Sequence, residues 1–156
     1  MDSVTVQEGN DENDSPSGRG ALRGPARVAG RRPDRRRPGQ GRAYAAWDAA
    51  FNKGDARAVA AFYTADATFL PATHDVIEGP AGVEKFFAGL FANGVTGHKL
   101  EMIEATGGGP LVVGAAKWSA NGKDASGAPS SFGGVATHVF ETQPDGSLKL
   151  KLHTFN

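Results

Sequence analysis

All thirteen aromatic residues of this 156-residue chain lie after position 42, and this distribution decides where a hydrophobic core can form. Residues 1–42 contain nine arginines, four prolines and seven glycines. Such a segment buries too little apolar surface to offset the conformational entropy that is lost on ordering. We therefore expect a disordered tail over 1–42, acidic at first and arginine-rich over 19–42, followed by one folded domain over 43–156.

Missing residue types exclude several classes of protein. The chain has no cysteine, which rules out disulfides, thiol nucleophiles and thiolate metal sites. No segment approaches the roughly 18 consecutive apolar residues of a membrane span, and the acidic first residues are unlike a secretory signal. We expect a cytoplasmic protein that does not associate with membranes. The arginines of 19–42 suit phosphate contacts, but no aromatic residue lies among them to stack on bases, so a nucleic-acid partner is not expected.

Three segments of the folded part have apolar residues at helical spacing. The first covers 43–53 and the second covers 56–63, with Asp55 placed to cap the second helix. The third covers 79–92 and has Pro80 in its first turn, where the missing N–H of proline costs nothing.

Elsewhere the pattern is the alternation that is typical of strands. Helices that precede most of the strands indicate an α+β domain, in which the helices pack on one face of an antiparallel sheet. We expect strands over 67–70, 99–105, 111–119, 132–141 and 148–155.

The last two strands form a hairpin whose register can be estimated. A turn centred on Pro144 and Asp145 pairs Ala136 with His153 and makes His138 and His153 diagonal neighbours on one face. By hydrophobicity alone the opposite face is the better candidate for the core, and a single bulge would exchange the two faces. That opposite face carries Val135, Thr137, Val139, Leu150 and Leu152.

The order of elements and the run WDAAFNKGDARAVAAFYTADATFLP at 47–71 resemble the SnoaL-like branch of the nuclear transport factor 2-like, or cystatin-like, superfamily. That superfamily includes ketosteroid isomerases and polyketide cyclases. The likeness covers 43–156 and extends to the closing DGSLKLKLHTFN. It implies a cone-shaped roll, in which a curved, mixed and mainly antiparallel sheet packs on three N-terminal helices around an apolar pocket. It also implies a homodimer through the outer face of the sheet.

The same resemblance suggests which side chains meet a ligand. His74 belongs to the loop at the mouth of the cone, and Asn156 follows a pocket-facing residue. The resemblance directs seven side chains into the cone: Trp47, Tyr63, Phe69, Trp118, His138, His153 and Phe155. Such a lining favours a flat, apolar ligand with one or two polar groups.

His138 and His153 are the expected catalytic residues, because the pKa of imidazole near neutrality suits proton transfer. Two histidines without a third ligand do not make a metal site, so we expect neither a metal nor a cofactor. We expect His98, at the start of a strand, to face solvent. Residues 121–131 are expected to form a flexible loop that can cover the cone.

Three positions decide against steroid isomerisation. The base and the two acidic donors of those isomerases correspond here to Pro71, Trp47 and Ala136, none of which can do that chemistry. The resemblance therefore implies a protein that binds a small apolar molecule, as a cofactor-independent isomerase, cyclase or hydratase. The alternative is a non-catalytic dimeric accessory module with a vestigial pocket.

Overall fold

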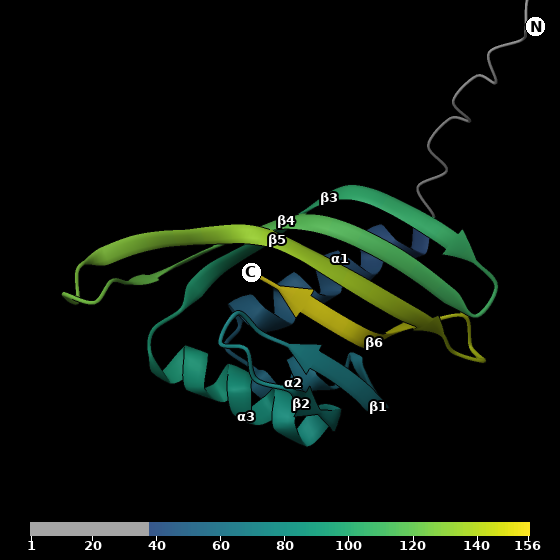
Figure 1. Ribbon diagram of the computed structural model, residues 1–156, viewed down its shortest axis with the longest axis horizontal. Helices are drawn as coiled ribbons and strands as arrows, with labels where there is room; N and C mark the ends of the chain where they lie inside the picture. The colour runs from purple at the N-terminus through teal and green to yellow at the C-terminus, as the bar shows by residue number, and fades with distance from the viewer. Residues whose placement is uncertain (1–37) are drawn as a thin grey trace, which may run out of the picture. The chain divides into compact units, whose positions relative to one another are not determined.

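Residues 38–156 are described by a computed structural model, in which three helices pack against one curved six-stranded sheet (Figure 1). The helices are α1 (Pro38–Asn52), α2 (Ala56–Ala60) and α3 (Gly79–Ala92). The strands are β1 (Tyr63–Leu70), β2 (Ile77–Glu78), β3 (Thr96–Gly108), β4 (Leu111–Lys123), β5 (Pro129–Thr142) and β6 (Leu148–Phe155). Their order is β2-β1-β6-β5-β4-β3, and only the β1–β6 pair is parallel. The predicted α+β class and the mixed, mainly antiparallel sheet are confirmed.

Two helix boundaries differ from the predicted ones by more than one residue. Helix α1 begins at Pro38, five residues before the predicted start, and Gln40 in its first turn is fully buried. Proline at a helix start is favourable because its fixed φ suits the first turn. Helix α2 ends at Ala60, since Tyr63 already belongs to the strand that pairs with β6. The expectation of a disordered tail falls, over 1–37, outside the described residues.

Strands β4 and β5 extend beyond the predicted ends. Strand β4 continues to Lys123 and β5 begins at Pro129, so most of the segment predicted as a flexible loop is paired sheet. Only 124–128 remain as a turn. Its first residue, Asp124, accepts hydrogen bonds at Oδ1 from the backbone N–H groups of Ser126 and Ala128, at 2.8 and 3.0 Å. The segment is therefore an ordered β-hairpin with a short hydrogen-bonded turn, and not a flexible loop.

The β5–β6 hairpin contains two extra residues that the register estimate omitted. Gly146, with φ of 80°, adds a residue at the turn, and a bulge at Lys151 adds another between the Phe140–Leu150 and Val139–Leu152 pairs. Each extra residue exchanges the two faces, so two of them restore the original assignment. His138 and His153 consequently lie directly opposite each other, on the predicted shared face.

That shared face is the buried one, which contradicts the estimate from hydrophobicity. His138 and His153 are 2% and 5% exposed, whereas Val135 on the other face is 47% exposed. The sequence predicts Leu150 on the face opposite the histidines, together with Val135. The register shift at the bulge places it on the inner face instead, where it is 3% exposed. The concave face of the sheet and the helices together form the core.

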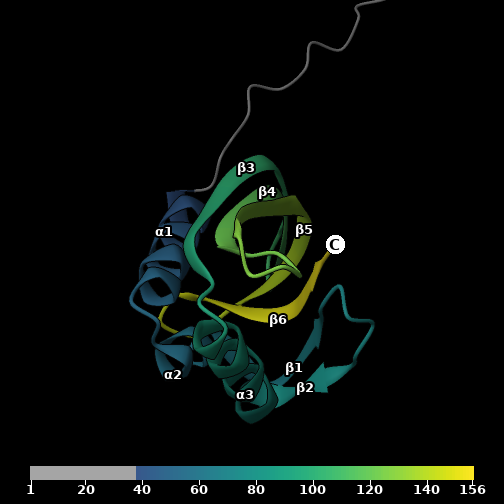
Figure 2. The ribbon, with the colours of Figure 1, turned by 90° about the vertical axis from the view of Figure 1, so that its left-hand side faces the viewer.

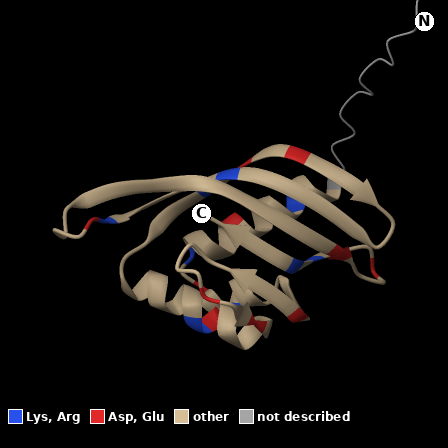
Figure 3. Ribbon diagram, in the orientation of Figure 1, with Lys and Arg blue, Asp and Glu red and all other residues tan. Residues whose placement is uncertain are grey.

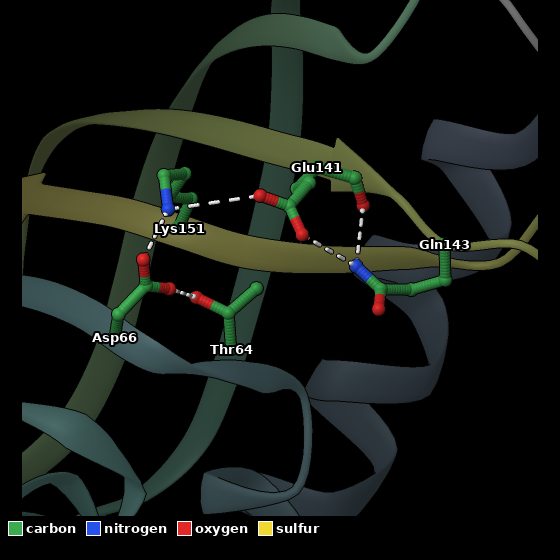
Figure 4. A network of polar contacts seen from close by, with 5 residues as sticks. All are labelled: Thr64, Asp66, Glu141, Gln143 and Lys151. Carbon is green, nitrogen blue, oxygen red and sulfur yellow. Dashed lines mark hydrogen bonds and ion pairs between the residues drawn. The ribbon is translucent and has the colours of Figure 1, made fainter.

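A polar network on the outer side ties the bulge to the neighbouring strands (Figure 4). The Lys151 ammonium lies 2.6 Å from Asp66 Oδ2 and 3.6 Å from Glu141 Oε2. Thr64 donates to Asp66 Oδ1 at 2.9 Å, and Gln143 donates to Glu141 Oε1 at 3.1 Å. Lys151 holds the pKa of the Asp66 carboxyl below its ordinary value. The network thus links β1, β5 and β6 at the point where the register shifts.

Charged residues elsewhere on the described chain are mixed in sign (Figure 3). Nine Lys and Arg and eleven Asp and Glu lie in residues 38–156, on helices, strands and turns. None of the helices within 38–156 is both long and apolar enough to cross a membrane.

Candidate functional site

An apolar cavity of about 330 Å³ lies between the concave face of the sheet and helices α1 and α3. Figure 2 shows the curl of β3, β4 and β5, with α1 and α3 beside its open side. Small residues on the inner faces of β4 and β5, Ala120 and Ala136, leave room beside much larger aromatic rings. The lining includes Trp47, Phe51, Phe86, Phe87, Leu90, His98, Leu100, Trp118, Phe132, His138, His153 and Phe155. The volume falls in the range of sites that hold small molecules.

Five of the nine residues predicted for the site line this cavity: Trp47, Trp118, His138, His153 and Phe155. Tyr63 and Phe69 lie behind the lining, 1% and 0% exposed, and both contact His153. They support the wall and do not border the cavity themselves.

His74 and Asn156 are also absent from the lining. His74 adopts a left-handed conformation, with φ of 65°, in the loop whose residues Ala72 and Thr73 border the cavity. Asn156 contacts a residue of the lining, because its carbonyl oxygen accepts a hydrogen bond from the indole N–H of Trp118 at 3.0 Å.

His138 and His153 form a buried pair at the back of the cavity. Their ring centroids are 4.5 Å apart, with an angle of 35° between the planes. Each ring is bonded at Nδ1 by a tyrosine hydroxyl, Tyr44 at 2.9 Å for His138 and Tyr63 at 2.7 Å for His153. The two tyrosines come from α1 and β1, so elements on both sides of the pair fix its orientation.

Burial keeps both histidines neutral. It lowers the pKa of His138 from 6.5 to about 4, with a smaller contribution from His98. Burial, followed by the neighbouring His138 and His98, lowers the pKa of His153 well below its ordinary value. At neutral pH the pair therefore offers hydrogen bonds from uncharged rings, rather than the easy proton exchange of an ordinary imidazole.

Gly114 makes room for one of these tyrosines. It pairs with His138 across the sheet, and a Cβ atom at this position would lie 2.5 Å from Tyr44 Oη. Such a separation forces the neighbouring atom to move, so the hydroxyl reaches His138 only because residue 114 has no side chain.

His98 also lines the cavity, which contradicts the expectation that it faces solvent. Its side chain is 9% exposed, and it packs against the rings of Trp47 and Phe51. Strand β3 begins at Thr96, two residues before His98, so the alternation that points Leu100 inward also points His98 inward. Extending the predicted strand backwards by one residue would have revealed this.

A carboxylate from α1 orients the His98 ring. Asp48 Oδ1 lies 2.7 Å from His98 Nδ1, and Asp48 Oδ2 accepts the Leu100 backbone N–H at 2.9 Å. One turn later on α1, the Asn52 amide bonds both the N–H and the C=O of the His98 backbone, at 2.8 and 2.9 Å. The helix thus fixes both the ring and the strand that carries it. Sequence reasoning missed Asp48, which is 50 residues away from its partner.

The described residues contain no group of three His, Asp or Glu side chains arranged to hold a metal ion. Among the titratable groups at this cavity, the Asp48–His98 pair and the two neutral histidines have fixed hydrogen-bonding partners, and Lys123 also borders it. A base oriented by a carboxylate, next to hydrogen-bonding groups in an apolar site, is suited to proton transfer.

Solved structures show where else this architecture occurs. A ketosteroid isomerase-like protein from Erwinia carotovora atroseptica has a TM-score of 0.65 and 18% identity, covering 74% of this chain and 90% of that one. Aln2 from a Streptomyces species has a TM-score of 0.65 and 20% identity, covering 76% and 87%. An NTF2-like protein with a cystatin-like fold from Novosphingobium aromaticivorans has a TM-score of 0.63 and 17% identity, covering 75% and 78%. At these identities the likeness establishes the fold.

Sequence comparison gives the family itself. No curated protein matches the chain. The sequence pattern of the SnoaL-like domain matches residues 43–149, well over half of the chain. With the predicted superfamily confirmed by both its sequence and its fold, this protein belongs to the SnoaL-like domain family.

Proposed function

We propose that this protein binds a flat, apolar small molecule in the cavity and catalyses a proton transfer on it without a cofactor, as an isomerase, cyclase or hydratase does. The observation that carries the proposal is the Asp48–His98 pair, at 2.7 Å, beside an apolar cavity of about 330 Å³. A ligand held there is largely removed from water, where a base and neutral hydrogen-bonding groups act most strongly.

His98 is the proposed base. Because a carboxylate only accepts hydrogen bonds, the contact with Asp48 assigns a proton to His98 Nδ1, so in the neutral ring the lone pair is on Nε2. In an isomerisation, Nε2 takes a proton from a carbon next to a carbonyl group, and the C–H electrons move into the conjugated system. The same Nε2–H then returns the proton at another carbon, so the reaction consumes and releases nothing.

This assignment also explains how chemistry can persist although the isomerase positions are changed. A similar solved structure is named as ketosteroid isomerase-like, but the base position of those enzymes is Pro71 here. His98 supplies a base from a different strand, β3, facing the same cavity. His138 and His153, the catalytic residues expected from the sequence, are then proposed as hydrogen-bonding partners of the ligand.

Solvent deuterium exchange tests the proposal. We expect the full chain to bind 1-tetralone, a flat ketone with exchangeable hydrogens, and to incorporate deuterium next to the carbonyl faster than buffer with an equal concentration of free imidazole. Mass spectrometry measures the incorporation, and shifts of the histidine ring resonances report binding. Ala136→Leu, which narrows the cavity, should lose both signals, whereas Val135→Leu on the outer face should keep both. Exchange that is equal in the two variants would contradict the proposal.

The non-catalytic dimeric module remains the second candidate, because the outer face of the sheet is apolar. Ile103, Val113 and Val135 on that face are 56%, 36% and 47% exposed. We propose that a second copy of the chain covers this face. Sedimentation should show a dimer for the wild type and a monomer for the Val113→Glu, Val135→Glu double variant. Val76 serves as the control, because it is also apolar and 68% exposed but lies in the loop after β1. The Val76→Glu variant should therefore remain a dimer. A dimer that shows no deuterium exchange would favour this module over the enzyme.

A further inference from the structure

We infer that the cavity presents fixed and opposite hydrogen-bonding polarities: His138 and His153 both offer an Nε2–H donor, while His98 offers an Nε2 acceptor. The ligand class is then an apolar carbonyl compound, whose oxygen takes both donors and whose acidic hydrogen meets His98. This inference deepens the proposed function and rests on it for the role of His98, but the polarity of each ring can be measured without any ligand.

The hydrogen bond from Tyr44 fixes the polarity of His138. Burial raises the pKa of Tyr44, so its hydroxyl keeps its proton and must donate it. His138 Nδ1 lies 2.9 Å away and can accept it, whereas the nearby Gln40 amide has no hydrogen-bond partner. The reverse bond would leave a buried O–H without an acceptor, which costs about 1–3 kcal/mol. A neutral ring that accepts at Nδ1 carries its proton on Nε2.

The same argument applies to His153. Burial also raises the pKa of Tyr63, so its hydroxyl keeps its proton. His153 Nδ1 lies 2.7 Å away and can accept that proton, whereas the reverse bond would leave a buried O–H without an acceptor. His153 therefore also carries its proton on Nε2.

Both Nε2–H groups lack a partner within the described protein. The fully enclosed side-chain nitrogens and oxygens without a hydrogen bond are, among these residues, the amide of Gln40 and the indole nitrogen of Trp47. His138 and His153 are not in that group, although their Nδ1 atoms are both occupied, and both rings border the cavity. Two neighbouring donors that open only onto an apolar cavity point to a ligand acceptor.

One carbonyl oxygen satisfies both donors. Its two lone pairs accept two hydrogen bonds, and the His138 and His153 rings, 4.5 Å apart, are close enough to share one atom. As negative charge develops on this oxygen during proton removal by His98, neutral donors stabilise it without first having to be ionised. Tyr44 and Tyr63 are therefore positioning residues, since they act on the ligand only through the histidines.

Ring-nitrogen NMR of the full chain, with ¹⁵N-labelled histidine, tests the assignment directly. At pH 7 we expect the proton on Nε2 for His138 and His153 and on Nδ1 for His98. The opposite tautomer at His138 or His153 would overturn the inference. Tyr44→Phe and Tyr63→Phe should each give a mixture of tautomers at the histidine that has lost its bond and leave the other unchanged. Gly114→Ala, which displaces the Tyr44 hydroxyl, should affect His138 alone.

A ligand comparison tests the chemical class. We expect 1-tetralone to bind at least about tenfold more tightly than tetralin, which has the same rings without the oxygen. The preference should fall toward unity in the Tyr44→Phe, Tyr63→Phe double variant. Equal affinities for the two compounds in the wild type would overturn the carbonyl assignment. A missing deuterium exchange with the expected tautomers would instead refute only the catalytic proposal.

Discussion

Replacing His98 by glutamine is expected to slow deuterium exchange on a bound ketone by about 100-fold to 10,000-fold, the usual contribution of a positioned base. Glutamine keeps a polar group of similar length but cannot take the proton. Ligand affinity should change by less than about threefold, because the two donors that hold the carbonyl oxygen come from other strands. The measurement is exchange rate against ligand concentration, which separates binding from proton transfer.

Asp48→Asn provides the matched test of the orienting carboxylate. Asparagine has one acceptor where aspartate uses two oxygens, for His98 Nδ1 and for the Leu100 N–H. We expect slower exchange and a population of His98 with its proton moved to Nε2. His74→Asn, which alters a histidine outside the cavity lining and keeps a residue tolerant of positive φ, should have no effect. A comparable loss in His74→Asn would show that the base lies elsewhere.

Acidification from pH 6.5 to about 4 is expected to remove about 3 kcal/mol from the free energy of unfolding through His138 alone. The unfolded chain binds a proton at this side chain below pH 6.5, whereas the folded chain resists it until about pH 4. Protonation therefore favours unfolding throughout this window, and the loss stops once both states are protonated. His153 contributes in the same direction, because its pKa in the folded state is also lowered.

Urea unfolding at pH 7, 6 and 5 isolates this effect. The carboxyls of Asp66, Asp124 and Asp145 also have lowered pKa values. Their contribution to the free energy of unfolding is lost as the pH falls below their ordinary pKa of 3.8, which lies outside this range. The His138→Gln, His153→Gln double variant should have a flatter dependence on pH, whatever its stability at pH 7. A wild-type stability that is constant from pH 7 to 5 would contradict the burial of both rings.

Some of the fold was accessible from local sequence pattern. The N-cap at Asp55, whose Oδ1 accepts the Ala58 N–H at 2.9 Å, and the start of α3 at Gly79 both follow from residues within a few positions. The end of α2 did not, because Tyr63 joins β1 through pairing with β6, more than 80 positions later. Local periodicity contains no information about such a partner.

The candidate site divides in the same way. The sequence predicts that His138 and His153 share a face because a single hairpin brings them together. The predicted register omits two residues, one at the turn and one at the bulge, and the two omissions cancel in their effect on which face each side chain occupies. Asp48 and His98 meet through the packing of α1 on β3, and the hydrogen bonds from Asn52 strengthen that contact. Nothing within ten residues of either side chain indicates the pair.

The compensation in the β5–β6 hairpin limits how its length can vary. Deleting either Gly146 or Lys151 would shift the parity of everything beyond it and turn one imidazole toward the solvent. Deleting both Gly146 and Lys151, or inserting two further residues, would keep His138 and His153 on the same face of the sheet. Related chains that keep two inward histidines here should therefore differ in loop length by even numbers, which makes loop parity a criterion for sorting members of the family by site chemistry.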